Sequence, residues 1–278
     1  TINIAAVNDA AVMVAGANRA YTEGVSATAI SSGLTLSDVD DTAIATGAMV
    51  SITAGLTSGD VLSIASGSLL GGATASYNSG TGVLTFTGST TVSNYQSMLR
   101  AVSFSSTSED PTSQSTTRTV TYSVTDANAS AASNSAQTTT ATSTVTITAV
   151  NDTPVGTAGG SLAYTENGAA TAIDTTITLI DVDDTQIVGA TVTITSALTG
   201  DVLGFTGQND ITGIYDASTG VLTLTGTATL AQYETALRSV TYRSTSDDPT
   251  VANTRNSRTV TWVVTDANSD SVGAQTST

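Results

Sequence analysis

The chain has 278 residues, enough for two domains of ordinary size, and carries 7 Lys+Arg against 23 Asp+Glu, for a formal net charge of -16. It contains no histidine and no cysteine, and every basic residue is an arginine, which excludes Ser-His-Asp and Cys-His nucleophiles, Schiff-base lysines, disulfides and the usual zinc sites. The acidic balance argues against nucleic acid and anionic membranes as partners, and no run of about 18 apolar residues is present that would insert into a membrane.

Two copies of one unit make up the sequence. The string Val7–Asp9 recurs as Val150–Asp152, and an Asp-x-Asp-Asp string appears once in each copy. The repeat length of about 140 residues is longer than the roughly 20–50 residues of solenoid units, so each copy is expected to fold as its own domain. We place repeat 1 at residues 8–150 and repeat 2 at residues 151–278.

Taken in chain order, each copy shows the alternation that is typical of strands. Val50 and Ile52 alternate with Ser and Thr, and the same pattern covers residues 119–125 and 144–149. Between them, Tyr77–Val83 has the Gly-containing centre of a hairpin loop. Such strands have one apolar and one hydroxylated face and are expected to bury the apolar face, as antiparallel sheets do. The sequence therefore predicts an all-β fold with one β-sandwich per copy.

One segment of each copy breaks this alternation. Apolar residues recur there at helical spacing, at Val92, Tyr95, Met98 and Leu99 in repeat 1 and at Leu230, Tyr233 and Leu237 in repeat 2. The strings Ser93–Gln96 and Thr229–Gln232 each resemble a capping box. We predict one short helix per copy, a connector that leads directly into the next strand and suggests no chemistry.

Clustered carboxylates are the chemical signal of the sequence. Asp38, Asp40 and Asp41 lie within four residues of one another, and the cluster recurs at 181–184. Carboxylates so close repel one another unless a cation neutralises them, and Ca²⁺ takes 6–8 oxygen ligands of this kind. The alternative interpretation is a solvated acidic turn in which Asp side chains bond their own backbone. Recurrence of the cluster in both copies, together with a repeated Glu and a repeated Asn-Asp, favours Ca²⁺.

The order of these motifs resembles a known family. A Glu lies near the first strand, then come Asp-x-Asp-Asp, a strand ending in Asp, and the string Val145–Pro154. This order is similar to that of the cadherin-like repeats of large bacterial RTX-type surface adhesins. The resemblance implies tandem Greek-key (cadherin/Ig-like) sandwiches with Ca²⁺ at their junctions. It also implies a structural extender or adhesion repeat of a filamentous protein at the bacterial cell surface, and no enzymatic activity.

The resemblance further implies which residues hold the ions. At the junction between the repeats the expected ligands are Glu23, Asn151, Asp152, Asp181, Asp183 and Asp266. The equivalent half-site at the chain start comprises Asn8, Asp9, Asp38, Asp40 and Asp126. Asp41 and Asp184 stay open as ligands or near neighbours, and Glu166 is expected at the base of repeat 2. Both repeats lack the Leu-Asp-Arg-Glu string of animal cadherins, so fewer ions per junction are expected. Asp60, in a Gly-Asp turn, is not expected to affect Ca²⁺.

A carbohydrate-binding module of cadherin-like type is the alternative function, with polysaccharide as partner. It depends on the eight tyrosines forming a platform. Trp262 aligns with Tyr122 on an alternating strand, and we expect it in the core. The paired carboxylates Asp38/Asp40 and Asp247/Asp248 are candidates for a glycosidase acid and base, but a small sandwich offers no evident cleft for them.

The two ends of the chain are out of phase with the repeats. Residues 1–7 align with residues 144–150, the closing strand of repeat 1. They are therefore interpreted as a closing strand that belongs to a preceding repeat or to another subunit, and repeat 2 is expected to lack its own closing strand. One explanation is a window of a longer repetitive chain. The other is head-to-tail assembly by strand complementation, in which Ile2 and Ile4 of one copy fill the groove of the next.

Overall fold

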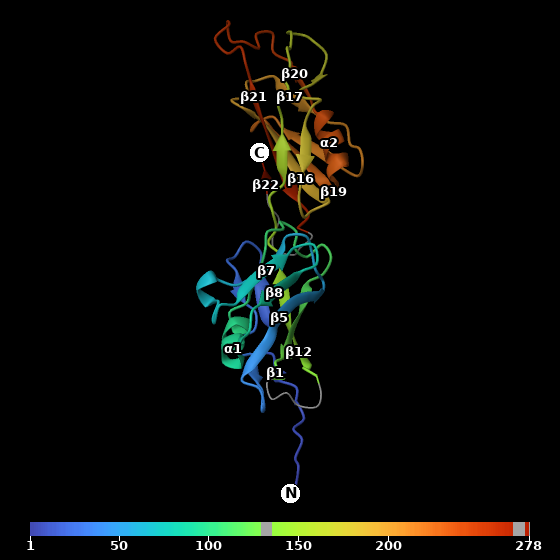
Figure 1. Cartoon of the computed structure of the whole chain (residues 1–278). Helices are drawn as coiled ribbons and strands as arrows, with labels where there is room; N and C mark the ends of the chain where they lie inside the picture. The colour runs from blue at the N-terminus through green and yellow to red at the C-terminus, as the bar shows by residue number, and fades with distance from the viewer. Residues whose placement is uncertain (129–134, 269–275, 278) are drawn as a thin grey trace. The chain divides into compact units, whose positions relative to one another are not determined.

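A computed structural model describes residues 1–128, 135–268 and 276–277 of the chain. The chain divides into two compact units, unit 1 over Thr1–Val150 and unit 2 over Asn151–Thr278. Each unit consists of strands with one short α-helix (Figure 1). In the described part of the chain, neither α-helix has the length and apolar character needed to cross a membrane.

Unit 1 contains one large sheet and two small ones. The large sheet has the order β2-β12-β11-β5-β8-β7, with β9 paired to β5. Its strands are β2 (Arg19–Thr22), β12 (Thr138–Thr148), β11 (Thr117–Asp126), β5 (Ala43–Ala54), β8 (Val83–Thr87), β7 (Thr74–Asn78) and β9 (Thr90–Thr91). In one small sheet β10 (Ser103–Ser106) lies between β3 (Thr28–Ala29) and β6 (Asp60–Ser63), and the other pairs β1 (Val12–Val14) with β4 (Thr35–Ser37). A 3-10 helix, η1, spans Ser66–Ser68.

The alternating residues of these strands form the core of unit 1. Val120, Tyr122 and Val124 of β11 are buried, and they share one core cluster with Phe104 of β10. The rings of Tyr21 in β2 and Phe104 meet edge to face, with centroids 5.1 Å apart. Apolar faces from different sheets thus enclose one core.

Unit 2 repeats this plan with fewer strands. Its main sheet has the order β18-β19-β16-β21-β22, with β18 (Thr212–Asp216), β19 (Val221–Thr229), β16 (Gln186–Thr195), β21 (Thr259–Asp266) and β22 (Thr276–Ser277). In one small sheet β20 (Thr241–Ser244) lies between β14 (Thr171–Ala172) and β17 (Asp201–Gly204), and the other pairs β13 (Val155–Thr157) with β15 (Thr178–Ile180). The prediction of an all-β sandwich fold is confirmed.

The hairpin predicted around Tyr77–Val83 is present in unit 1. β7 pairs with β8 in antiparallel register from Thr74 opposite Thr87 to Asn78 opposite Val83. Gly82, which closes the loop, has a φ of 67°, a left-handed conformation that glycine adopts without steric cost.

The predicted helices are present, but one N-cap differs from the prediction. The helices are α1 (Val92–Arg100) and α2 (Leu230–Arg238). Thr229 and Gln232 form the capping box predicted for α2. In α1 the predicted cap Ser93 lies inside the helix, and Thr91 is the N-cap, accepting a hydrogen bond from the Asn94 amide. The predicted box partner Gln96 accepts instead from the Leu36 amide at 2.9 Å.

A buried ion pair connects two strands of unit 1. Arg118 of β11 donates through Nε to Asp60 Oδ2 of β6 at 2.6 Å and through Nη2 to Asp60 Oδ1 at 3.3 Å, and both side chains are fully buried. The guanidinium also donates to the carbonyls of Pro111 and Ser115, each at 2.6 Å. Asp60 is therefore a buried structural residue at the start of β6, and the guanidinium of Arg118 neutralises its charge there.

Unit 2 contains the same ion pair in a more open setting. Arg258 Nε lies 2.5 Å from Asp201 Oδ2, and the Arg258 side chain keeps 11% exposure while that of Asp201 has none. Tyr242 donates to the same carboxylate at 2.6 Å. Burial alone would raise the pKa of Asp201, but the bonds from Arg258 and Tyr242 lower it below its ordinary value.

Asp174 in unit 2 anchors a loop through one buried carboxylate. It is 3% exposed and accepts from the amides of Gly159 at 2.9 Å, Gly160 at 2.7 Å and Thr176 at 2.7 Å. Burial alone would raise the pKa of Asp174, but these bonds and the Thr176 hydroxyl together lower it from 3.8 to about 2. The ionised form is therefore the one that stabilises the fold.

Replacing Asp174 by Asn is expected to lower the free energy of unfolding of unit 2 by about 2 kcal/mol at pH 7. Since the folded pKa lies below the unfolded value, the contribution is complete above about pH 5 and is lost as the pH falls toward 2. Urea unfolding of both proteins at pH 7 and at pH 2.5 to 3 measures the difference.

Ser31 provides the matched control, because it occupies the equivalent position in unit 1 and accepts from the Gly16 amide at 2.7 Å. Ser31→Ala is expected to have an effect that does not vary with pH between 3 and 7, since a hydroxyl does not titrate there. A difference between Asp174→Asn and the unaltered chain that stays constant down to pH 2.5 would contradict the assignment.

Candidate metal centres

The loop between β4 and β5 holds three carboxylates in one turn. Asp38 Oδ1 accepts from the amide of Asp40 at 3.2 Å and from the amide of Asp41 at 3.0 Å, so the first carboxylate organises the loop that carries the other two. Asp40 Oδ2 in turn accepts from the Asp9 amide at 3.1 Å. One oxygen each of Asp38 and Asp40 is thus used for backbone bonds.

Two residues from distant parts of unit 1 complete this cluster. Asp126 is the last residue of β11 and is fully buried, and Asn8 precedes β1 and is also buried. Asn8 Nδ2 donates to Asp126 Oδ2 at 3.1 Å. The amide of Gln137 donates to both oxygens of Asp126, at 3.0 and 3.1 Å. The strand β11 therefore delivers its terminal carboxylate to the same end of the unit as the β4–β5 loop.

Unit 2 builds the same constellation with the same bonds. Asp181 Oδ1 accepts from the amides of Asp183 and Asp184, at 3.3 and 3.1 Å, in the loop between β15 and β16. Asp183 Oδ2 accepts from the Asp152 amide at 3.0 Å. Asn151 Nδ2 donates to Asp266 Oδ2 at 3.0 Å, at the end of β21. Repetition of four contacts in two units shows that the arrangement belongs to the motif and not to one loop.

The carboxylate oxygens of each cluster converge. In unit 1, Asp38, Asp41 and Asp126 offer oxygens that all lie within 4.8 Å of one another, and in unit 2 Asp181, Asp184 and Asp266 do the same. Asp41 and Asp184, left open by the sequence, are thus brought into the clusters, and each is only 4% exposed.

Some side-chain oxygens in and beside these clusters are buried without a hydrogen-bond donor. Among the described residues, Asp38 Oδ2 and Asp40 Oδ1 have no donor in unit 1, and Asp181 Oδ2 and the side-chain oxygen of Asn151 have none in unit 2. A buried oxygen without a donor costs free energy that a bound cation would recover.

The pKa values of two of these carboxyls also indicate that the clusters lack a compensating positive charge. The pKa of Asp181 is raised from 3.8 to about 6, mainly because burial disfavours the charged form and also because the Asp183 carboxyl lies next to it. The pKa of Asp38 is raised in the same direction by burial, with Asp40 as its charged neighbour. Each loop therefore holds a carboxylate whose negative charge is poorly compensated by the protein itself.

These donor sets fit Ca²⁺. They consist of carboxylate and amide oxygens only, and the loops supply no nitrogen or sulfur ligand. Ca²⁺ prefers oxygen ligands and tolerates flexible geometry, whereas zinc and copper sites use imidazole or thiolate. Asn8, Asp38, Asp40, Asp41 and Asp126 would hold the ion in unit 1. Asn151, Asp181, Asp183, Asp184 and Asp266 would hold it in unit 2.

The remaining predicted site residues are Asp9, Asp152, Glu23 and Glu166. The main-chain amides of Asp9 and Asp152 donate to the carboxylates of Asp40 and Asp183, as described above. Glu23 follows β2, is 8% exposed, and accepts from the Val150 amide at 2.8 Å at the end of unit 1. That Glu23 binds the same ion as Asn151, Asp152, Asp181, Asp183 and Asp266 stays a prediction. Glu166, its counterpart in unit 2, is exposed.

Glu109 is a residue that sequence reasoning missed. A carboxylate oxygen of Glu109 lies within 4.8 Å of one of Glu23. The Ser-Glu-Asp-Pro string around it is a surface-turn pattern, and nothing in its spacing connects it to Glu23, which lies far away in the sequence. Only the tertiary fold brings the two carboxylates together.

The residues of the alternative functions have structural partners. None of the eight tyrosines, all within the described residues, is exposed. Tyr77 and Tyr215 donate to the carbonyls of Asp60 and Asp201 at 2.8 and 3.0 Å, which shows that these hydroxyls connect strands. Asp248 accepts from the Ala252 amide at 3.0 and 2.9 Å in an exposed turn. The described residues therefore present no exposed row of tyrosines on a sheet face.

Comparison with known proteins finds similarity to one stretch of a far longer chain. No protein-family model matches the sequence. It is 40% identical over 91 residues to halomucin of Haloquadratum walsbyi, a stretch covering 30% of this chain and 1% of halomucin, so the chain spans a very small part of that relative. Among solved structures, it is similar to the extracellular cadherin domains 1–5 of protocadherin gamma B2. That match has a TM-score of 0.33 and 12% identity, over 98% of this chain and 38% of the other.

Proposed function

We propose that this chain is a pair of Ca²⁺-binding structural repeats of cadherin-like type, which extend a long extracellular adhesion protein and catalyse no reaction. The observation that carries the proposal is the oxygen-only cluster present in both units, with buried carboxylate oxygens that have no donor at Asp38 and Asp181. The likeness to a stretch of halomucin supports a place in a long surface protein, at the outside of the cell.

The clusters suggest how Ca²⁺ would act mechanically. In unit 1 the ion would connect three segments that are far apart in the sequence: the residues before β1, the β4–β5 loop and the end of β11. In unit 2 it would connect the equivalent segments. With its charges compensated, each unit end becomes rigid, which is the property that a spacer in an extended protein needs.

Asn substitutions at Asp38 and Asp181 test the ligand assignment. The variants Asp38→Asn and Asp181→Asn can keep the oxygen that accepts from the loop amides, but they replace the other carboxylate oxygen by an NH2 group and remove the charge. Each is expected to weaken Ca²⁺ binding at its own unit by about tenfold or more, which corresponds to about 1.4 kcal/mol or more. Isothermal titration of the metal-free protein with CaCl₂ measures the loss, and titration with MgCl₂ measures the preference for Ca²⁺.

Asp216 provides a matched control in unit 2. Its carboxylate also organises a turn, accepting from the Ser218 amide at 2.8 Å and the Ser218 hydroxyl at 2.6 Å, but it is exposed and belongs to neither acidic cluster. Asp216→Asn is expected to bind Ca²⁺ like the unaltered chain. Equal loss in Asp216→Asn and Asp181→Asn would show that only the overall charge attracts the ion, and that the clusters are not sites.

A further inference from the structure

Each α-helix is bonded to the segment that leads into the acidic loop of its unit, which lies between β4 and β5 in unit 1 and between β15 and β16 in unit 2. In unit 1, Gln96 Oε1 of α1 accepts from the amide of Leu36 in β4 at 2.9 Å. Arg100 Nε, which lies on the same face of the helix, donates to the Leu34 carbonyl at 2.5 Å. β4 pairs with β1, and an antiparallel ladder uses the backbone groups of alternate residues, so the helix side chains bond groups that β1 does not.

Unit 2 contains the same two bonds. Glu234 Oε1 of α2 accepts from the amide of Leu179 in β15 at 2.7 Å, and Arg238 Nε donates to the Ile177 carbonyl at 2.7 Å. Glu234 and Arg238 also form an ion pair at 3.4 Å. A neutral amide in unit 1 and a carboxylate in unit 2 thus accept the same backbone bond, so the position needs an oxygen acceptor and not a charge. We call the two side chains of each unit the helix clamp.

The start of each helix is bonded to the last residue of the acidic loop. The amide of Val92, the first residue of α1, donates to the Thr42 carbonyl at 3.1 Å. In unit 2 the amide of Leu230, the first residue of α2, donates to the Thr185 carbonyl at 3.4 Å. In each unit one short helix therefore holds the chain on both sides of the clustered carboxylates.

These attachments restrict the loop between them. In unit 1 only residues 37–41 lie between Leu36 and Thr42, and within this stretch the first carboxylate accepts from the amides of the other two. A loop whose ends are fixed has less conformational entropy to lose when it closes on an ion, because part of that entropy is already lost on folding. The helix would thereby raise the fraction of loops in the binding conformation, and with it the apparent affinity for the ion.

We propose that the helix clamp positions each acidic loop for its cation, so that Gln96 and Arg100 in unit 1, and Glu234 and Arg238 in unit 2, are positioning residues of the metal centres. The bonds described go to the backbone before the loop and not to the clustered carboxylates, so the clamp acts through the loop. The inference rests on the proposed function, because it concerns the same Ca²⁺ sites. It also gives a role to the helix, which the sequence predicts to be only a connector.

Two substitutions of one residue isolate the clamp bond in unit 2. Glu234→Met removes the acceptor but keeps an unbranched side chain and a good helix propensity. Glu234→Gln keeps an oxygen acceptor, which is the side chain that unit 1 has at this position. Both substitutions remove the same negative charge and the same ion pair with Arg238. A difference between the two variants therefore reports on the backbone bond alone.

Amide hydrogen exchange of the metal-free chain tests the clamp without any ion. Measured by NMR in EDTA, the amides of Asp183 and Asp184 are expected to exchange about threefold to tenfold faster in Glu234→Met than in Glu234→Gln, which is the size of effect of one lost hydrogen bond. The amides of Asp40 and Asp41 in unit 1 are expected to exchange equally in both variants. Equal exchange at Asp183 and Asp184 would overturn the proposal.

Titration with CaCl₂, followed through the same amide resonances, reports on each unit separately. Glu234→Met is expected to have a Kd in unit 2 about threefold to tenfold higher than that of Glu234→Gln, with the Kd of unit 1 the same in both. Equal Kd values in unit 2 of the two variants would overturn the proposal and leave the proposed function intact. Absence of Ca²⁺ binding to the unaltered chain would instead contradict the proposed function, and with it the role of the clamp in binding.

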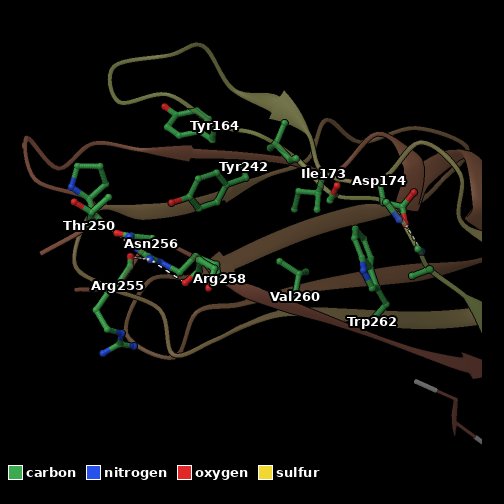
Figure 2. A pocket seen from close by; sticks show the side chains of 17 residues that line it. Tyr164, Ile173, Asp174, Tyr242, Thr250, Arg255, Asn256, Arg258, Val260 and Trp262 are labelled. Carbon is green, nitrogen blue, oxygen red and sulfur yellow. Dashed lines mark hydrogen bonds between the residues drawn. The ribbon is translucent and has the colours of Figure 1, made fainter. Parts of the chain in front are cut away.

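Tyr242→Phe is the matched control for a general loss of stability. Tyr242 lines the pocket drawn in Figure 2, and its hydroxyl donates to Asp201 Oδ1 at 2.6 Å. Asp201 pairs with Arg258, which precedes β21, whereas Asp266 of the metal centre is the last residue of that strand. The variant is expected to lower the melting temperature and to leave both Kd values unchanged. A rise in the Kd of unit 2 as large as that in Glu234→Met would show that lost stability is responsible, and would overturn the proposal.

Discussion

Replacing Asp60 by Ala is expected to lower the free energy of unfolding of unit 1 by about 3–5 kcal/mol, because it leaves the buried guanidinium of Arg118 without its counter-charge. Both side chains are fully buried, and two charged hydrogen bonds join them. The carbonyls of Pro111 and Ser115 still accept from Arg118 in the variant, but they cannot neutralise it. Urea unfolding followed by far-UV circular dichroism measures the loss.

Three comparisons separate this explanation from general damage. The double variant Asp60→Ala/Arg118→Met is expected to recover much of the loss, since it removes the charge as well. Asp201→Ala is expected to cost less, because Arg258 keeps 11% exposure and water can partly solvate it. Trp262 lies in unit 2, so its fluorescence should follow the unfolding of unit 2 and not change in Asp60→Ala. A loss below about 1 kcal/mol in Asp60→Ala would show that the pair contributes little.

Adding Ca²⁺ is expected to raise the melting temperature of the metal-free chain. At a free Ca²⁺ concentration of about 100 times Kd, a site that exists only in the folded state stabilises it by about 2.7 kcal/mol. For units of this size the gain corresponds to roughly 5–10 °C. The physical reason is that the ion removes the repulsion among converging carboxylates such as Asp38 and Asp126 and pairs with buried oxygens. Scanning calorimetry in EDTA and in millimolar Ca²⁺ measures the shift.

General screening must be separated from binding, since the net charge is -16. NaCl at matched ionic strength is expected to raise the melting temperature by much less than Ca²⁺ does. The double variant Asp38→Asn/Asp181→Asn is expected to melt at nearly the same temperature with and without Ca²⁺. Identical melting curves of the unaltered chain in EDTA and in Ca²⁺ would contradict the proposed function directly.

Local pattern was enough to predict the strands, the helices and the acidic loops. The alternation around Val120 and Tyr122 predicts a half-buried strand, and both residues are fully buried in β11. The Asp38–Asp41 cluster is formed by bonds that span only two or three residues, so a short string contains all the information for it. The N-cap of α1 was wrong by two residues because Ser93 and Thr91 can both cap a helix, and the position of the preceding strand decides between them.

Contacts between side chains that lie far apart in the sequence could not be predicted from local patterns. Asp60 reads as a turn residue until β6 and β11 bring it to Arg118, 58 positions away. Glu109 likewise becomes part of an acidic pair only through the fold. A carboxylate has the same local pattern whether it binds a cation, an arginine or water, and only its neighbours in space distinguish these roles.

The sequence by itself determined the class of the fold, the twofold repeat and the recurrence of the acidic loops, because these depend on residue type and on spacing along the chain. The tertiary structure decided which carboxylates converge and which are neutralised by an arginine. Those outcomes depend on which strands lie side by side, and strand pairing is set by the whole core and not by any one segment.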